Sequence, residues 1–411
     1  MSGGEAGALT VRVATSLKDV PKTAWNACAN PHAFEAATCA TQAVKTEPGG
    51  ADPDNPFVSH EFLSALEESG CIGGRTGWSP AYLLVEDEAG ALLAATPSFL
   101  KGHSQGEYVF DHSWADAYTR AGGRYYPKLQ VAAPFTPATG PRLLVATGER
   151  EDEARRGLIA GLEALREQTS ASSTHVTFAR EPDIGALTQA GYLERHDLQF
   201  HWQNDGFATY DDFLATLASR KRKALKRERR EALSAGITVE ILSGTDLTEA
   251  VWDDFHSFYE DTGARKWGRP YLNRAFFSAV GAAMGERIVL VMAKRAGRYI
   301  AGAINFRGGN TLYGRNWGCI EDHPFLHFEL CYHQAIDYAI AHGLARVEAG
   351  AQGEHKLARG YRPVITRSLH HLADPGLRRA VAAYLKDERR HIAEARTLLE
   401  AESPFRKDGD G

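Results

Sequence analysis

The amino-acid sequence predicts an α/β protein, built from helices and a mixed β-sheet in two similar halves that a basic helix joins. Apolar strands and segments of helical period alternate along the chain, which favours helices packed on the faces of a sheet. The same order of strands, helix and strand occurs twice. A length of 411 residues also fits two domains better than one compact core.

Composition and charge narrow the class of protein. The 43% hydrophobic and 24% charged residues are typical of a packed globular chain. A net charge of −5 gives no general attraction to nucleic acid, and we expect no DNA partner. The first residues lack the apolar core of a secretory signal and no stretch is long enough to span a membrane, so we expect a cytoplasmic protein.

Five cysteines without a CxxC pair predict reduced thiols rather than disulfides or a zinc site. The cysteines are Cys28, Cys39, Cys71, Cys319 and Cys331.

The N-terminal part, residues 1–55, is expected to hold a strand, a helix and a long loop. Residues 28–55 are rich in Ala, Thr, Pro and Gly, which favours a loop. From Pro56, helical spacing of apolar residues and a stop at Gly70 predict a helix.

Two pairs of segments resemble each other in the same order. Residues 82–102 and 289–309 each read as two apolar strands around a glycine turn. Later, a short helix ends at Gly191 or Gly360, an aromatic residue follows, and a strand closes the unit. Chance likeness of common turns is the alternative, and the shared order disfavours it.

A helix and a strand lie between the members of each pair, at 151–180 in the first half and 325–350 in the second. This order predicts a mixed sheet that can open at its centre and admit a ligand between strands. The expected organisation is an N-terminal part at 1–55, a first domain at 56–205, a basic linking helix at 206–236, a second domain at 237–402 and a tail at 403–411.

The linking segment ASRKRKALKRERREALSAG is expected to form one helix that ends at Gly236. Its positive stripe attracts phosphates, either of a nucleotide or CoA, of a tRNA backbone or of anionic lipid headgroups. The alternative is a solvated helix that Glu228 and Glu231 partly neutralise. The candidate phosphate- or membrane-binding residues are Arg220, Arg222, Lys223, Lys226 and Arg227.

In the first half, residues 106–144 mix aromatic, polar and proline residues as the walls of a small-molecule site do. An equally good interpretation is that the tyrosines and prolines stiffen a long connection. The candidate substrate-binding residues are Glu107, Asp111, Tyr125, Tyr126 and Lys128.

The second half holds the denser group of reactive side chains. In a helix from about Pro324, His327 and Cys331 would share one face, and Glu329 and His333 another. The Glu–His pair suits a metal, but further ligands are not apparent, so no metal is predicted. For Cys331 a small buried hydrophobe is favoured over a nucleophile.

Glu354, His355 and Lys356 follow a strand directly and should lie at its carboxyl end, where open α/β sheets bind ligands. Amide formation needs a base for the amine proton and a donor for the negative charge that develops on the carbonyl oxygen. His355 or His327 suits the role of the base, and Lys356 or Arg359 suits the role of the donor. The candidate catalytic residues are His355, Lys356, Glu354, His327 and Glu329, with Arg359, Asn316, Trp317 and Cys331 as substrate contacts.

With these stretches, the chain after about Asn55 resembles the FemAB-like family, which is related to the GNAT acyltransferases and labelled for peptidoglycan biosynthesis or recognition. The most specific pieces are NPFVSHEFLSALEESG, the 106–144 stretch, SRKRKALKRERREA, LHFELCYHQAIDYAI and GAQGEHKLARGYRP. The resemblance implies two GNAT-like folds in tandem and transfer to an amine. Chains of this kind are also similar to bacterial ceramide synthases, which join a fatty acyl thioester to a sphingoid base.

The resemblance favours an N-acyltransferase that joins a fatty acyl thioester to a lipid amine by base-assisted direct attack. Acyl-CoA or acyl carrier protein would be the co-substrate, no cofactor would be bound permanently, and the protein would touch the inner membrane peripherally. One departure leaves the donor open: the Q/R-x-x-G-x-G/A loop of ordinary GNAT enzymes is replaced here by CIEDHPFLHFE. The alternatives are a Fem-type transferase that adds amino acids from aminoacyl-tRNA to a peptidoglycan precursor, and a non-catalytic module that binds cell-wall or lipid precursors.

Overall fold

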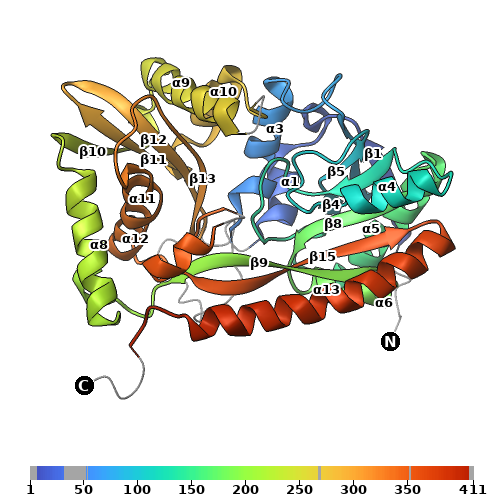
Figure 1. Cartoon of the computed structure of the whole chain (residues 1–411). Coiled ribbons are helices and arrows are strands. Elements are labelled where there is room, and N and C mark those ends of the chain that lie inside the picture. Colours follow the sequence, from blue (N-terminus) through green and yellow to red (C-terminus); the bar gives the residue numbers. More distant parts are fainter. Residues whose placement is uncertain (1–6, 32–51, 53, 267–269, 351–352, 407–411) are drawn as a thin grey trace. The chain divides into compact units, whose positions relative to one another are not determined.

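The computed structural model of the chain describes residues 7–31, 52, 54–266, 270–350 and 353–406 (Figure 1). The chain forms two compact units. Unit 1 comprises Met1–Gln42, Pro53–Asp197 and Thr366–His391, and unit 2 comprises Ala43–Asp52, Leu198–Ile365 and Ile392–Gly411. Helices and mixed sheets make up both units, which confirms the predicted α/β class.

Unit 1 contains two sheets. One has the strand order β1-β3-β4-β7, and the other contributes β15-β8-β6-β5-β2, in which β6 and β8 are parallel and the other pairs antiparallel. The strands are β1 (Thr10–Ala14), β2 (Trp78–Pro80), β3 (Tyr82–Glu86), β4 (Leu92–Thr96), β5 (Ser98–Lys101), β6 (Lys128–Val131), β7 (Leu144–Val145), β8 (Ser173–Ala179) and β15 (Arg362–Leu372).

The helices of unit 1 cover these sheets. Apolar residues of α5 such as Leu158 and Leu162 are buried in one core with Leu83 and Val85 of β3. The helices are α1 (Lys22–Ala29), α3 (His60–Glu68), α4 (His112–Arg120), α5 (Glu151–Gln168), α6 (Asp183–Gln189) and α13 (Pro375–Ala401), with short turns η1 (Leu17–Asp19) and η2 (Pro56–Val58). Of α13, the residues up to His391 belong to unit 1 and those from Ile392 to unit 2.

Unit 2 has the strand order β10-β11-β12-β13-β14-β9, in which only β13 and β14 are parallel among the described pairs. The close approach of α9 to β13 requires Gly318, because a Cβ there would lie 2.1 Å from the carbonyl oxygen of Phe258. The strands are β9 (Leu193–Gln203), β10 (Ile237–Leu242), β11 (Ile288–Arg295), β12 (Arg298–Arg307), β13 (Thr311–Cys319) and β14 (Arg346–Glu348).

Helices also flank the unit 2 sheet. Leu330 and Ile336 pack into the core with Val291 of β11 and Val347 of β14. The helices are α7 (Tyr210–Ala215), α8 (Ser219–Ala232), α9 (Glu249–Lys266), α10 (Arg274–Met284), α11 (Leu326–Phe328) and α12 (Gln334–Ala341), with short turns η3 (Gly244–Asp246), η4 (Gly285–Arg287), η5 (Glu329–His333) and η6 (Glu354–Arg359).

The last strands of the two repeats are exchanged between the units. β9 ends the first repeat, yet its residues His201–Gln203 pair with β14 in unit 2. β15 ends the second repeat, yet Arg367–Leu372 pair with β8 in unit 1. Each repeat therefore supplies the last strand of the other unit.

Three element boundaries differ from the sequence expectation. The basic helix α8 ends at Ala232, four residues before Gly236, because the chain turns through Leu233–Gly236 into β10. The expected loop from Cys28 begins later, since Cys28 lies in α1, and residues 32–51 and 53 lie outside the described residues. The helix expected from Pro56 is a turn, η2, followed by α3, which Ser59 caps through the Phe62 N–H.

A proline makes the second strand of the first repeat differ from its counterpart in the second repeat. The second strand of the first repeat is divided at Pro97 into β4 and β5, which belong to different sheets, whereas its counterpart β12 is continuous. Proline has no N–H for the ladder, so it ends the pairing of β4.

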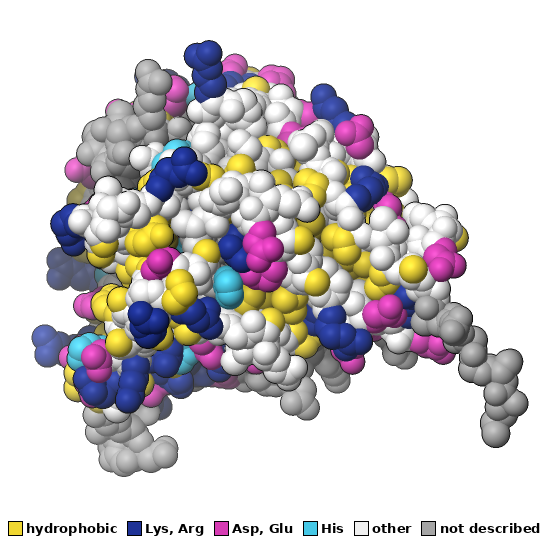
Figure 2. Space-filling view, turned by 90° about the vertical axis from the view of Figure 1, so that its right-hand side faces the viewer, with side chains coloured by type: hydrophobic (Ala, Val, Ile, Leu, Met, Phe, Trp, Pro, Cys, Tyr) yellow, Lys and Arg dark blue, Asp and Glu magenta, His cyan; other side chains and the backbone are white. Residues whose placement is uncertain are grey.

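The surface mixes both signs of charge. On the face in Figure 2, basic and acidic side chains alternate with apolar ones. None of the described helices is long and apolar enough to cross a lipid bilayer.

Candidate active site

The candidate site of unit 2 lies where two parallel strands part. β13 and β14 pair only through Thr311–Tyr313 and Arg346–Glu348. β14 ends at Glu348, whereas β13 continues to Cys319. Such an opening in the middle of a sheet leaves strand-edge peptide groups beside a gap that a ligand can enter.

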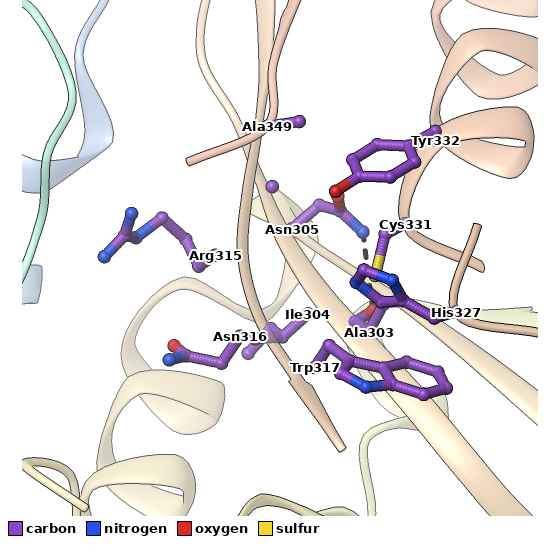
Figure 3. Close-up of a pocket in the computed structure, with 11 residues that line it drawn as sticks. Ala303, Ile304, Asn305, Arg315, Asn316, Trp317, His327, Cys331, Tyr332 and Ala349 are labelled. Atoms are coloured by element: carbon purple, nitrogen blue, oxygen red, sulfur yellow. Dashed lines mark hydrogen bonds between the residues drawn. The ribbon is translucent and has the colours of Figure 1, made fainter. Parts of the chain in front are cut away.

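A bulge shapes the strand at this opening. Ile304 of β12 lies opposite Asn316, but its neighbour Asn305 lies opposite Gly314, so Arg315 is an extra residue in β13. Bulges bend a strand and redirect its side chains. In Figure 3, Arg315 points away from Cys331 and His327.

A cavity of about 80 Å³ occupies the opening. Pockets for whole drug-sized ligands are about 300–1,000 Å³, so this cavity fits the reacting part of a larger substrate. Figure 3 shows the Tyr332 hydroxyl, the His327 ring and the Cys331 sulfur gathered in front of Asn305. The lining residues are Ala303, Ile304, Asn305, Gly314, Arg315, Asn316, Trp317, His327, Cys331, Tyr332 and Ala349.

The helical wall of the cavity is irregular. After α11 the chain makes a π-helical turn, η5, from Glu329 to His333. This turn contributes two consecutive residues, Cys331 and Tyr332, to the cavity, and α11 adds His327. Single π-turns inside helices frequently mark functional sites.

Tyr332 is held by a hydrogen bond from the side of η6. The distance from its hydroxyl oxygen to His355 Nε2 is 2.8 Å. Burial raises the pKa of Tyr332 well above its ordinary value. The phenol therefore stays protonated. In the tautomer of the exposed His355 that carries its proton on Nε2, the ring donates to the phenol oxygen, and the Tyr332 O–H can donate into the cavity.

Behind the cavity wall, a polar network fixes η5 to α8. Glu228 accepts hydrogen bonds from His333 at 2.8 Å and from Arg359 at 2.6 and 2.8 Å. Burial acts to raise the pKa of Glu228, but these hydrogen bonds outweigh it and lower the pKa. The Tyr210 hydroxyl lies 2.6 Å from Nδ1 of His333. Both ring nitrogens of His333 thus have hydrogen-bond partners, and these hydrogen bonds hold the π-helical turn η5 in place.

Glu329 belongs to a second buried ion pair and does not line the cavity. It is fully buried, and Arg229 of α8 lies 2.9 Å from its carboxylate. Arg229 also reaches Asp337 at 2.6 Å, and Gln334 donates to Glu329 at 2.7 Å. These contacts give Glu329 a structural role in joining α8 to the cavity wall.

The segment after β14 carries the remaining candidates of the second half. Glu354 and His355 are exposed at the start of η6, which begins six residues after β14 ends at Glu348. Lys356 is buried, and its Nζ donates to the Gly350 carbonyl at 2.9 Å. Burial lowers the pKa of Lys356 to about 8. Arg359 covers the Phe328 ring at 3.4 Å and donates to the His355 carbonyl.

The candidates of the first half form a buried ionic network in unit 1. Lys128 lies 2.7 Å from Asp111 and 3.2 Å from Glu107, and the Tyr125 hydroxyl donates to Asp111 at 2.8 Å. Tyr126 hydrogen-bonds Ser104.

Lys101 joins the same network. Its Nζ lies 3.2 Å from Glu107, and burial lowers the pKa of Lys101 to about 7. Burial acts to raise the pKa of Asp111, but Lys128 and His175 lower it well below its ordinary value.

Unit 1 closes its own parallel strand pair. Beyond β6, the chain returns so that Gly140 bridges Ala179 of β8 in parallel. Arg142 is fully buried and donates to the carbonyls of Thr177 at 2.8 Å and Ala138 at 2.7 Å. Protein atoms therefore occupy the position that corresponds to the opening in unit 2.

The basic residues of α8 divide between two faces. Glu228 and Arg229 face the cavity wall, whereas Lys226 pairs with Asp211 at 2.8 Å and Arg227 with Glu231 at 3.3 Å. Arg220, Lys223, Arg227 and Arg230 recur at helical spacing and are exposed, and Arg222 is half-buried.

Of the residues singled out in the sequence, His327, Cys331, Asn316 and Trp317 line the cavity. Sequence reasoning missed Asn305, Arg315, Tyr332 and Ala349, together with Ala303, Ile304 and Gly314. One signal was present: Asn305 is a buried amide within the apolar strand IAGAINF. Among the described residues, His, Cys, Asp and Glu form no group of three or more suited to a metal.

Two solved structures that resemble the chain weakly are a tandem GNAT protein from the clavulanic acid biosynthesis pathway (13% identity, 90% of this chain and 99% of that one, TM-score 0.45) and L-PGS from Bacillus licheniformis (10%, 88% and 100%, TM-score 0.48). No curated protein matches the chain.

The structure of FemX matches over 80% of this chain and 96% of its own, at 13% identity and a TM-score of 0.51, which shows a shared fold. The model of the FemAB-like family, described as peptidoglycan biosynthesis/recognition, matches residues 16–407. The chain, with its tandem units and its opened parallel strand pair, belongs to the FemAB-like family.

Proposed function

We propose that this protein is an N-acyltransferase that forms an amide bond at the cavity of unit 2. The observation that carries the proposal is the meeting of His327, Tyr332 and Cys331 in a small cavity at the edge of β13. An extended, amide-bearing donor could pair with that strand edge as an added strand does. Its reactive carbonyl would then lie among these side chains.

His327 is the proposed base. An attacking amine must lose a proton, and a histidine at the cavity surface can take it near neutral pH. The ring is fixed by aromatic neighbours, since its centroid lies 5.1 Å from that of Trp317 and 5.6 Å from that of Tyr332.

Tyr332 is the proposed acid. Its raised pKa keeps a proton on the hydroxyl, which can donate to the leaving group or to the carbonyl oxygen as charge develops there. The exposed His355 holds the hydroxyl through its Nε2. The exposed ring can exchange protons with solvent and restore the proton of Tyr332.

For the substrates, we propose a fatty acyl thioester, from acyl-CoA or acyl carrier protein, and a lipid amine such as a sphingoid base. The outward face of α8, with Arg220, Lys223 and Arg227, supplies positive charge for a phosphate of the donor or for an anionic inner-membrane surface. The first lysines and arginines have no acidic residue beside them in the first turn of the helix.

The second candidate is a Fem-type transferase that uses aminoacyl-tRNA and a peptidoglycan precursor. The family description, peptidoglycan biosynthesis/recognition, favours it. The same positive helix face suits an RNA backbone.

The test is a mass-spectrometric transfer assay on the purified chain. Palmitoyl-CoA with sphinganine is compared with charged tRNA plus a lipid-linked peptidoglycan precursor, each with and without ribonuclease. An N-acylated base that His327→Ala loses supports the lipid reaction, with the exposed His342→Ala as matched control. Product from the tRNA arm alone assigns the second candidate, and product from neither arm rejects transfer at this site.

A further inference from the structure

Cys331 stands apart from the other cysteines of the described chain. Cys28 and Cys71 are buried, and burial raises the pKa of Cys28 to about 12, which keeps that thiol unreactive. Cys331 is half-buried, and its sulfur faces the cavity between His327 and Tyr332 (Figure 3). Cys319 has similar exposure but does not line the cavity.

Tyr361 is a buried tyrosine with an unsatisfied hydroxyl, and it packs against Tyr332 of the cavity wall. Its side chain is fully buried, and its hydroxyl has no hydrogen-bond partner among the described residues. Its ring packs edge-on against Tyr332 with 5.6 Å between centroids. A buried donor without a partner is destabilising, so this hydroxyl is suited to donate a hydrogen bond to a bound substrate.

Two buried polar side chains, Tyr361 and Lys356, lie within electrostatic range of Cys331. Burial raises the pKa of Tyr361, and negative charge on Tyr332 and Cys331 raises it further. Burial lowers the pKa of Lys356 to about 8, and negative charge on Cys331 acts in the opposite direction. The backbone joins the two, since the Tyr361 N–H donates to the Lys356 carbonyl.

We infer that Cys331 is a nucleophile that carries the acyl group as a thioester between donor and amine, with Lys356 as its base and Tyr361 as a donor to the carbonyl oxygen. This inference deepens the proposed function and rests on it. It replaces the direct attack expected from the sequence with two transfers at one cavity.

The two transfers balance. The Cys331 S–H proton passes to the neutral amine of Lys356, and the thiolate attacks the acyl carbon of the donor thioester. The carbon–sulfur bond to the donor breaks, and the leaving thiolate takes the proton from Lys356. The acceptor amine then attacks the Cys331 thioester and gives its proton to His327. The amide leaves, and the Cys331 thiolate remains beside Lys356 until it is reprotonated.

The first experiment omits the amine. The full chain is mixed with palmitoyl-CoA and quenched in acid. Its intact mass is measured by mass spectrometry, and the adduct is located by peptide mapping. We expect one palmitoyl group on Cys331 that neutral hydroxylamine removes, as it does a thioester. Cys331→Ala should lose both the adduct and turnover, whereas Cys319→Ala should keep both. Steady-state rates should follow a ping-pong pattern.

Tyr361→Phe separates a chemical role from a structural one. Removing a hydroxyl without a partner should leave the unfolding midpoint unchanged or raise it. Our inference nevertheless expects acyl-enzyme formation to slow at least about tenfold, because the carbonyl oxygen loses a donor. An unchanged rate of adduct formation would remove Tyr361 from the reaction.

The possible outcomes distinguish a failure of the acyl-enzyme inference from a failure of the proposed transferase function. If the wild-type chain makes amide while rapid quenching finds no adduct, or if Cys331→Ala turns over normally, the acyl-enzyme is wrong and the transferase remains. If neither adduct nor amide forms with any donor, the proposed function fails as well. Should Cys331→Ala not fold, the presence or absence of the hydroxylamine-sensitive adduct on Cys331 of the wild-type chain decides the same question.

Discussion

The hydroxyl of Tyr332 has one hydrogen-bond partner on the exposed side of the cavity wall, His355, and the proposed proton transfer depends on it. Tyr332→Phe keeps the ring and its contacts with Phe328 and Tyr361. We expect kcat to fall about 10²–10³-fold, with little change in KM or in the unfolding midpoint.

The measurement is steady-state transfer together with thermal unfolding followed by circular dichroism. The matched control is Tyr338→Phe on the neighbouring helix α12, where the ring stacks on His342. A Tyr332→Phe enzyme with normal kcat would show that Tyr332 donates neither to the leaving group nor to the carbonyl oxygen.

Lys101 gives the stability of the protein a defined dependence on pH. Its folded pKa of about 7 lies below the ordinary lysine value of 10.5, because burial disfavours the charged form. Between these two values the unfolded chain binds more protons than the folded one, so unfolding becomes harder as pH rises. Below pH 7 this contribution no longer changes with pH.

The free energy of unfolding, measured in urea at pH 7.5 and pH 9.5, should therefore rise more in the wild type than in Lys101→Met. Exposed Lys18→Met serves as the control and should rise as the wild type does. Equal pH dependence in wild type and Lys101→Met would mean that Glu107 keeps Lys101 charged in the folded state.

At the scale of elements, α8 contains two glutamates with different surroundings. Glu228 binds His333 and Arg359, which are 0% and 6% exposed, whereas Glu231 makes an exposed pair with Arg227. Breaking a fully buried pair costs roughly 3–5 kcal/mol, and Glu228→Gln should cost less than that because Glu228 is partly exposed. Glu231→Gln should cost about 0.3–0.5 kcal/mol.

Urea unfolding of both variants checks the difference. Because Glu228 also holds the cavity wall through His333, transfer by Glu228→Gln should fall even at temperatures where the protein is folded. Equal stability of the two variants would show that the network adds nothing beyond the packing of α8.

The outward face of α8 makes a separate prediction about substrates. Lys223→Glu with Arg227→Glu should raise the KM for a phosphate-bearing donor several-fold at low salt, and the difference should shrink as salt screens the charges. The unfolding midpoint should stay within a few degrees, since neither side chain is buried. Salt-independent kinetics would indicate a solvated helix without a ligand.

Sequence patterns predicted where helices and strands lie along the chain better than which of them pack together. The helical period of α5 and the glycines at Gly191 and Gly360 specify local structure, and both appear as expected. The placement of β4 and β5 in different sheets and the π-turn at 329–333 depend on which strands and helices lie alongside. Local periodicity carries no information about those neighbours.

The site was predictable to the same degree. His327 and Cys331 were placed on one helix face by their spacing, and both line the cavity. Tyr332 was missed because a regular helix would turn it away from Cys331, whereas the π-turn brings both to the cavity. The role of Glu329 also could not be read from its spacing, because Arg229 is 100 residues away in the chain.

For the whole molecule, the exchange of closing strands forbids a division at the linking helix. A fragment of residues 206–411 lacks β9, so β14 loses one of its two neighbours. We expect this fragment alone to aggregate or to unfold without cooperativity. A chain cut after Asp205 with both pieces present should remain folded.

Size-exclusion chromatography and thermal unfolding of the fragment and of the cut chain make the comparison. Mixing separately refolded fragments 1–205 and 206–411 should restore a cooperative transition. Cooperative folding of 206–411 by itself would show that β9 adds little to unit 2.

The strand exchange also determines when β8 can pair with β15 during synthesis on the ribosome. β8 emerges early, but its native neighbour β15 follows only after the whole second repeat has been made. At ~5–20 residues per second, the edge of β8 waits roughly ten to forty seconds. During that interval β9 is the nearest strand available, so we expect the nascent first repeat to pair with its own last strand and to release it once β15 has been made.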